Sequence, residues 1–288
     1  MAKGSRQETE AMPEQGFWAP DALPYLEIRT TRNSSRAYAN HFHASLSIGL
    51  VFQGRTRFFC DGVVYEAAEG DIVVIGPGQV HSCNPVDGEP RGYHMLHLEA
   101  SWCLERMSGE EPVEVSGVVP GEGTIVAHRN SVRDAWLYQR LMCLVPALCR
   151  GDAAAGQDFA FAVEELFRQC CSMGNAAQTA SPLLRIRKEL RDGCEPPVSV
   201  ASLAGRAGFG REGFIRAFRR SAGLPPGAYR QCARLEQGRR LLRQGFSIAE
   251  AAQTAGFTDQ SHFHRMFVKY YCVTPGCYRK NKSLLYKK

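Results

Sequence analysis

One pattern occurs twice in the C-terminal third of the sequence. The first copy reads LAGRAGFGREGFIRAFRR (Leu203–Arg220) and the second reads AAQTAGFTDQSHFHRMFVK (Ala251–Lys269). Each copy contains an Ala-rich amphipathic segment, a Gly-aromatic break and a second segment whose aromatic residues recur at i and i+4. Small residues where two helices cross, with a Gly at the turn, are typical of a helix-turn-helix. The duplication therefore predicts two helix-turn-helix units in one all-α domain.

Charge is distributed unevenly along the chain. From Pro182 onward there are 21 Lys and Arg against 7 Asp and Glu, a net charge of +14, whereas residues 1–181 carry a net charge of −8. Most of the C-terminal cations are Arg within predicted helices, not in the terminal run from Lys280 to Lys288. A basic domain beside a mildly acidic one is typical of a protein that binds a polyanion. We therefore expect double-stranded DNA as the partner of the C-terminal domain.

The second helix of each unit carries the candidate DNA contacts. Its aromatic residues mark the buried face, so the opposite face is expected to meet the major groove. The residues expected at base edges are Arg211, Glu212, Ile215, Arg216, Gln260, Ser261, His264 and Arg265. Those expected at phosphates, farther along each helix, are Arg219, Arg220 and Lys269. Two outward arginines at matched positions, Arg216 and Arg265, each suit a guanine that accepts two hydrogen bonds.

A long helix is predicted between the two units, from Pro225 to Arg243. At ~1.5 Å per residue it spans ~28 Å, close to the ~34 Å that separates successive major grooves on one face of DNA. We expect this helix to act as a rigid spacer that sets the two units in adjacent grooves.

The C-terminal motifs closely resemble those of the AraC/XylS transcriptional regulators. The pattern as it stands in this chain is SxASLAxxAGF…FxRxF…GxxPxxYRxxxRLxxxRRLL…SIAEAAxxAGFxDQSHFHRMF…VTPxxYR, and it covers roughly the last 100 residues. The departures are Gly210 where the family usually has a Ser cap, Gly213 in the first recognition helix, and Cys272 in place of a Gly. The resemblance implies a sequence-specific transcriptional regulator, mostly of the activator type, with RNA polymerase as a partner. The base-edge positions named above match the family's base-contacting positions.

Short β-type runs separated by turn residues occupy the chain from about Tyr25 to Trp102. Strands this short and this regularly spaced predict a sandwich or small barrel. The segment resembles the cupin-type sensor domain of AraC-like regulators, through His41-Phe42-His43, Gly70, and Pro77-Gly78-Gln79-Val80-His81 followed by Asn84. Metal-binding cupins place a Glu where this chain has Ser47, and loss of that hard anionic ligand argues against a metal. We therefore expect neither metal nor cofactor.

Side-chain alternation along residues 41–52 predicts a pocket inside this barrel. Leu46, Ile48 and Leu50 share one face, while the other face is polar and small, which leaves room for a small-molecule effector. The residues expected to bind the effector are His41, His43, Ser47, His81, Tyr93 and His97. Three alternatives remain open at this point: histidines satisfied by neighbouring hydroxyls with no ligand, a cupin metalloenzyme fused to a DNA-binding domain, and a barrel that serves only as an interaction module.

The sequence thus predicts a two-domain α+β protein: an N-terminal cupin-like β-barrel with a helical hairpin, and a C-terminal all-α domain with two helix-turn-helix motifs. The expected segments are a disordered arm (1–20), the effector-sensing barrel (21–124), a helical hairpin for packing or dimerisation (125–172), a linker (173–182) and the DNA-binding domain (183–288). We expect a ligand-responsive regulator and not an enzyme. The resemblance implies that the hairpin forms a homodimer contact.

Cysteine usage and hydropathy indicate the compartment. The 11 cysteines are odd in number and irregularly spaced, with no CxxC pair. The N-terminus has no apolar h-region, and no apolar run approaches the length of a membrane span. Reduced cysteines in a cytoplasmic protein that does not bind membranes are therefore expected.

Overall fold

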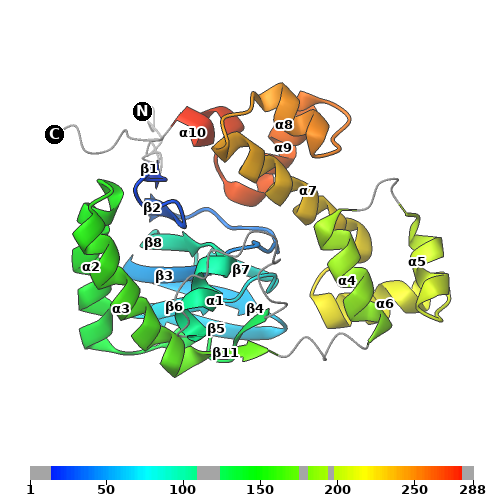
Figure 1. The fold of residues 1–288 in the computed structure, drawn as a ribbon. Helices are drawn as coiled ribbons and strands as arrows, with labels where there is room; N and C mark the ends of the chain where they lie inside the picture. The colour runs from blue at the N-terminus through cyan, green and yellow to red at the C-terminus, as the bar shows by residue number, and fades with distance from the viewer. Residues whose placement is uncertain (1–13, 109–123, 175–180, 194–197, 281–288) are drawn as a thin grey trace, which may run out of the picture.

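The computed structural model describes residues 14–108, 124–174, 181–193 and 198–280 of the 288-residue chain (Figure 1). A β-rich N-terminal domain with a helical hairpin precedes an all-helical C-terminal domain, as the sequence predicts. Within these ranges, no helix combines the length and the apolar character needed to cross a membrane.

Two antiparallel sheets face each other in the N-terminal domain. The larger sheet has the strand order β1 (Glu14–Trp18), β2 (Leu26–Ser34), β8 (Arg91–Leu98), β3 (Leu46–Gln53), β6 (Ile72–Ile75) and β10 (Ser131–Val132). The smaller sheet has the order β5 (Val63–Ala68), β4 (Arg55–Cys60) and β7 (His81–Pro85). A separate two-stranded ribbon pairs β9 (Thr124–Ala127) with β11 (Cys171–Gly174).

The two faces of β3 have the roles predicted from alternation. Leu46, Ile48 and Leu50 are fully buried and pack in one cluster with α2 (Ala135–Cys149) and α3 (Ala153–Cys170), which cover this face of the sheet (Figure 1). Gly49 and Val51 face the smaller sheet instead. The helical hairpin is therefore part of the core of its own domain, because each helix buries an apolar stripe against the sheet.

Three segments differ from the sequence-based expectation. Residues 14–18, which we assigned to a disordered arm, form β1 at the edge of the large sheet, where Trp18 gains a core position that its short polar context does not reveal. Residues 100–108, within the segment assigned to the barrel, form a helix, α1 (Ala100–Ser108). The first residues of the predicted linker, 173 and 174, belong to β11. Residues 1–13, 109–123 and 175–180 lie outside the described residues.

The C-terminal domain consists of the helices α4 (Pro182–Asp192), α5 (Val200–Arg206), α6 (Arg211–Ala222), α7 (Pro226–Arg243), α8 (Ile248–Thr254), α9 (Gln260–Tyr271) and α10 (Pro275–Lys280). Ser199 caps α5 by accepting from Ser202 N, and Ser247 forms a capping box with Glu250 at the start of α8. Asp259 caps α9 by accepting from His262 N. Gly210 offers no side-chain cap to α6, in line with the departure noted in the sequence.

The spacer helix α7 lies between the α5–α6 unit and the α8–α9 unit (Figure 1). Its 18 residues correspond to ~27 Å. Gly238 in its middle is explained by close approach, because a Cβ at this position would come within 2.5 Å of the Phe263 ring of α9. The second recognition helix is therefore held directly against the spacer.

The core of the C-terminal domain continues into the N-terminal domain. Phe42 and Val80 belong to the same buried cluster as the helix residues, and the Phe42 ring stacks on Tyr229 of α7 with centroids 4.5 Å apart. A Cβ on Gly223, at the C-cap of α6, would come within 2.9 Å of Val80 Cβ. The two domains thus share a packed interface and are not joined by the linker alone.

We predict opposite outcomes for two Gly-to-Ala substitutions in this domain. Gly238→Ala should lower the free energy of unfolding by about 1–3 kcal/mol, because overpacking against Phe263 outweighs the gain in helix propensity. Gly205→Ala in α5 should raise it by about 0.5–1 kcal/mol, since nothing lies within 4 Å of its added Cβ. Urea unfolding of the full chain measures both, and stabilisation by Gly238→Ala would contradict the close approach.

Candidate functional site

The predicted DNA-contacting side chains lie on the outer faces of α6 and α9. The aromatic residues of both helices are fully buried, as predicted, and therefore fix which face is outward. The exposed members of the predicted base-contacting set are Arg211, Glu212, Arg216, Gln260, Ser261, His264 and Arg265, and the remaining member, Ile215, is half-buried. The predicted phosphate contacts Arg219, Arg220 and Lys269 are also exposed. Their contact with DNA stays a prediction.

Docking of the two domains uses other surfaces of the C-terminal domain. Arg187 of α4 donates to the carbonyl oxygen of Gly78, and Tyr278 of α10 donates to Glu27 over 2.6 Å. The stack on Tyr229 places α7 at the centre of this interface. Among the described contacts, the outward side chains of α6 and α9 have no partner in the N-terminal domain. Both faces are therefore available to a second molecule.

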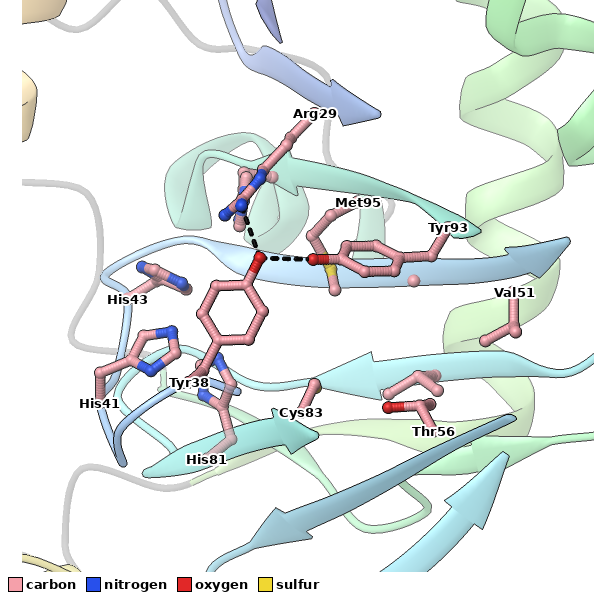
Figure 2. Close-up of a pocket in the computed structure, with 13 residues that line it drawn as sticks. Arg29, Tyr38, His41, His43, Val51, Thr56, His81, Cys83, Tyr93 and Met95 are labelled. Atoms are coloured by element: carbon pink, nitrogen blue, oxygen red, sulfur yellow. Dashed lines mark hydrogen bonds between the residues drawn. The ribbon is translucent and has the colours of Figure 1, made fainter. Parts of the chain in front are cut away.

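A cavity of about 50 Å³ lies between the two sheets of the N-terminal domain (Figure 2). Five of the six predicted effector-binding residues line it, namely His41, His43, His81, Tyr93 and His97. The sixth, Ser47, is buried behind the lining, where its hydroxyl lies 2.9 Å from His97 Nδ1. The structure thus brings the predicted residues together, while effector binding by them stays a prediction.

One cation of this cavity, Arg29, is not among the residues predicted from the sequence. Arg29 of β2 is buried and donates to the Tyr38 hydroxyl over 2.5 Å, which in turn lies 2.7 Å from the Tyr93 hydroxyl (Figure 2). The Nε of Arg29 is buried without a hydrogen-bond partner among the described residues. Burial, first of all, raises the pKa of Tyr38 well above its ordinary value, so this hydroxyl stays protonated. A signal existed in the sequence, because β2 alternates apolar and polar residues as β3 does, and the polar face of β3 was assigned to the barrel interior.

Three histidines converge at one end of the cavity. His41 and His81 pair through two backbone hydrogen bonds of 2.9 and 2.7 Å, and His43 lies beside both, with ring centroids 4.9 and 5.2 Å away. One ring nitrogen from each residue lies within 4.8 Å of the others. Burial lowers the pKa of His41 well below its ordinary value and that of His81 to about 3. Within the described residues, this is the group of side chains arranged to hold a metal ion.

The cavity is connected to the spacer helix by a buried network of charges. Glu236 of α7 accepts from His43 Nδ1 over 3.3 Å and from the Tyr271 hydroxyl over 3.1 Å, and it pairs with Arg239 at 2.6 Å. Arg239 also pairs with Glu27 of β2 at 2.8 Å. Burial alone would raise the pKa of Glu236, but Arg239 and His43 hold it well below its ordinary value. The network therefore links carboxylates from both domains through one guanidinium.

Comparisons with known proteins agree with this architecture. Residues 23–170 match the family of AraC-like ligand binding domains, and residues 203–281 match a family of helix-turn-helix domains. The chain is 26% identical over 245 residues to the HTH-type transcriptional regulator YbfI of Bacillus subtilis, covering 83% of this chain and 86% of that protein. It is 24% identical over 259 residues to the HTH-type transcriptional activator RhaS of Pectobacterium carotovorum, covering 85% of this chain and 88% of that protein.

Solved structures share the fold at low sequence identity. The structure of ToxT from Vibrio cholerae bound to an unsaturated fatty acid superposes with a TM-score of 0.60 at 11% identity, over 96% of this chain and 100% of that chain. At such identity the likeness concerns the fold alone. It covers both domains of the chain.

We predict that the shared guanidinium holds the two domains together. Arg239→Ala should lower the free energy of unfolding by about 3–5 kcal/mol, because it removes the guanidinium from buried Glu236 and leaves buried Glu27 only the longer 4.0 Å pair with Arg243. The neighbouring Arg240 is exposed on the same helix, so Arg240→Ala should change the value by no more than about 0.5 kcal/mol. Urea unfolding of the two full-length variants measures their free energies of unfolding. Equal losses in both variants would contradict the role of Arg239 in holding the domains together.

Proposed function

The chain belongs to the AraC family of transcriptional regulators, and from this premise we propose that it reads DNA with α6 and α9 under the control of an effector bound in the N-terminal cavity. The observation that carries the proposal is the duplicated unit, whose outward side chains are mostly polar or basic and are exposed. The protein acts by binding and not by catalysis. As in the family resemblance, we expect an activator that works with RNA polymerase in the cytoplasm.

The two recognition helices would enter adjacent major grooves on one face of the DNA. The ~27 Å length of α7 is close to the ~34 Å groove repeat, and packing of α9 against Gly238 fixes the second unit on this spacer. Arg216 and Arg265 would each bind a guanine, while Arg219, Arg220 and Lys269 would neutralise phosphates.

The effector would be small and polar. The cavity of about 50 Å³ is far below the ~300–1,000 Å³ of sites for larger organic ligands, and its lining is rich in imidazole. The buried Nε of Arg29 has no hydrogen-bond partner in the part of the chain that the structure describes, which supports a ligand with a hydrogen-bond acceptor, such as a carboxylate. The ToxT structure contains an unsaturated fatty acid, but the volume and lining here favour a shorter ligand.

A homodimer is the proposed assembly, with the helical hairpin as its contact. Trp136 of α2 and Phe161 of α3 are 63% and 62% exposed and lie outside the apolar stripe that each helix buries against the sheet. Large exposed aromatic side chains are enriched at protein interfaces.

Footprinting on the DNA upstream of the chain's own gene tests the reading function. We predict two protected segments about 10.5 base pairs apart on one face of the duplex. Protection of a single segment, or of segments on opposite faces, would contradict the spacer role of α7.

Two variants of α9 separate base contacts from phosphate contacts within the same experiment. Arg265→Ala should cost about 1–3 kcal/mol of binding free energy at the protected site and relax the preference at one base pair. Lys269→Ala should weaken binding to all sequences alike and reduce the slope of log K against log salt by about one. Identical behaviour of both variants on a panel of mutated sites would refute this division.

A thermal-shift screen with small carboxylates tests the effector site. A ligand at ~100 times its Kd should stabilise the wild-type chain by about 2.7 kcal/mol. Arg29→Met should lose this shift because it removes the buried cation. Arg32→Met, on the same strand but exposed, should keep it. A shift that survives in Arg29→Met would exclude the proposed role of Arg29.

A further inference from the structure

We propose that His41, His43 and His81 bind one divalent transition-metal ion at the interface between the two domains. All three residues are buried, and one ring nitrogen of each lies within 4.8 Å of the others. The proposal departs from our sequence-based expectation of a pocket without metal, which considered only the ligand missing at Ser47. The structure adds how the three rings are held.

Hydrogen bonds select the tautomer that a metal requires. Nδ1 of His41 lies 2.7 Å from the carbonyl oxygen of Ala39, and Nδ1 of His81 lies 2.9 Å from that of Gln79. Carbonyl oxygens only accept, so both Nδ1 atoms carry the proton. With the proton on Nδ1, Nε2 keeps its lone pair and is the nitrogen that can bind an ion.

The third ring is oriented by a carboxylate. Nδ1 of His43 lies 3.3 Å from Oε2 of Glu236, an acceptor that holds the proton on Nδ1 and leaves Nε2 as the ligand atom. A carboxylate behind an imidazole is a recurrent outer partner of metal-bound histidine, where it fixes the ring and raises its basicity. Here this partner comes from α7, in the other domain.

The donor set indicates the class of ion. Three neutral imidazoles suit Zn²⁺, Cu²⁺, Ni²⁺ or Fe²⁺ and do not suit Mg²⁺ or Ca²⁺. Zn–N bonds of ~2.0–2.1 Å put tetrahedral ligand nitrogens ~3.4 Å apart, so binding would draw the rings together from their present separation. A fourth position would face the cavity that contains Arg29 and Tyr38.

An interdomain cleft adjoins the small cavity. The cleft of about 610 Å³ is lined by His97, Glu236 and Arg239, and His97 also lines the small cavity. The buried side chain of His97 therefore separates the two spaces, and an ion that enters from the cleft would have to displace it.

Binding of an ion to the three histidines would affect the C-terminal domain. The Tyr271 ring stacks on His43, with centroids 5.8 Å apart and planes 20° apart, and its hydroxyl donates to Glu236. Movement of His43 toward an ion therefore acts on α7 and on the end of α9 through direct contacts. This coupling rests on the proposed DNA-binding function, whereas the metal site itself does not.

Zn²⁺ titration of the full-length, chelator-treated protein by calorimetry tests the site. We expect one Zn²⁺ per chain, and a loss of affinity of about 100-fold or more in the double variant His41→Ala/His81→Ala. His94→Ala is the matched control, because His94 is a buried histidine of the same domain that pairs with Thr30 outside the cluster. The control should bind like the wild type.

If the double variant fails to fold, the Co²⁺ absorption spectrum of the wild-type protein tests which side chains bind the ion. Visible ligand-field bands without thiolate charge transfer support coordination by imidazole. A thiolate band would assign the ion to the cysteines and overturn the proposal, as would the absence of 1:1 binding or unchanged affinity in a folded double variant.

Glu236→Gln tests the positioning role of the carboxylate. It should weaken Zn²⁺ binding by about 10-fold and reduce the effect of Zn²⁺ on DNA affinity, which we expect to be at least about 5-fold in the wild type. Equal Zn²⁺ affinity in the variant would overturn the role of Glu236. Zn²⁺ binding by a protein that shows no specific footprint would count against the proposed function and leave the metal site standing.

Discussion

The arrangement of the two domains depends on one buried guanidinium. Arg239 pairs with Glu236 on its own helix and with Glu27 on the β-sandwich. Removing three charges from water is costly, and it is tolerated only when each charge finds its partners at short range. This requirement fixes the rotation of α7 over the sandwich far more narrowly than apolar packing would, because a shifted helix would leave at least one carboxylate unpaired.

The spacer helix α7 contacts both the histidine cluster of the cavity and the helix α9. One side of α7 carries Glu236 toward His43 and the cavity, and Gly238, two residues on, receives the Phe263 ring of α9. A change at the histidines therefore acts on Glu236, and a change at α9 acts on Gly238. These residues lie two positions apart on the same helix, α7. Coupling between the sites requires only a small displacement of this helix, since interiors at native packing density transmit strain.

Local sequence patterns predicted much of the fold. The duplication predicted both helix-turn-helix units, and strand alternation together with the family resemblance predicted the inward face of β3 and five residues of the cavity lining. The sequence did not reveal β1, because a short edge strand depends on its partner for stability. Nor did it reveal the Glu236–His43 contact, which joins residues 193 positions apart. Such contacts follow from domain docking, which periodicity does not encode. The alternation of β2, by contrast, was a readable signal for Arg29.

Phe42 stacks on Tyr229, and Val80 packs against Gly223. These two contacts limit how the ligand specificity of such chains can change in evolution. A sensor domain whose side chains complete the core of the DNA reader is not a freely exchangeable module. Recombination with another reader would leave an apolar gap unless positions 42, 80, 223 and 229 were inherited together. New effector specificities in this lineage are therefore expected to arise by substitution within the cavity and not by exchange of whole domains.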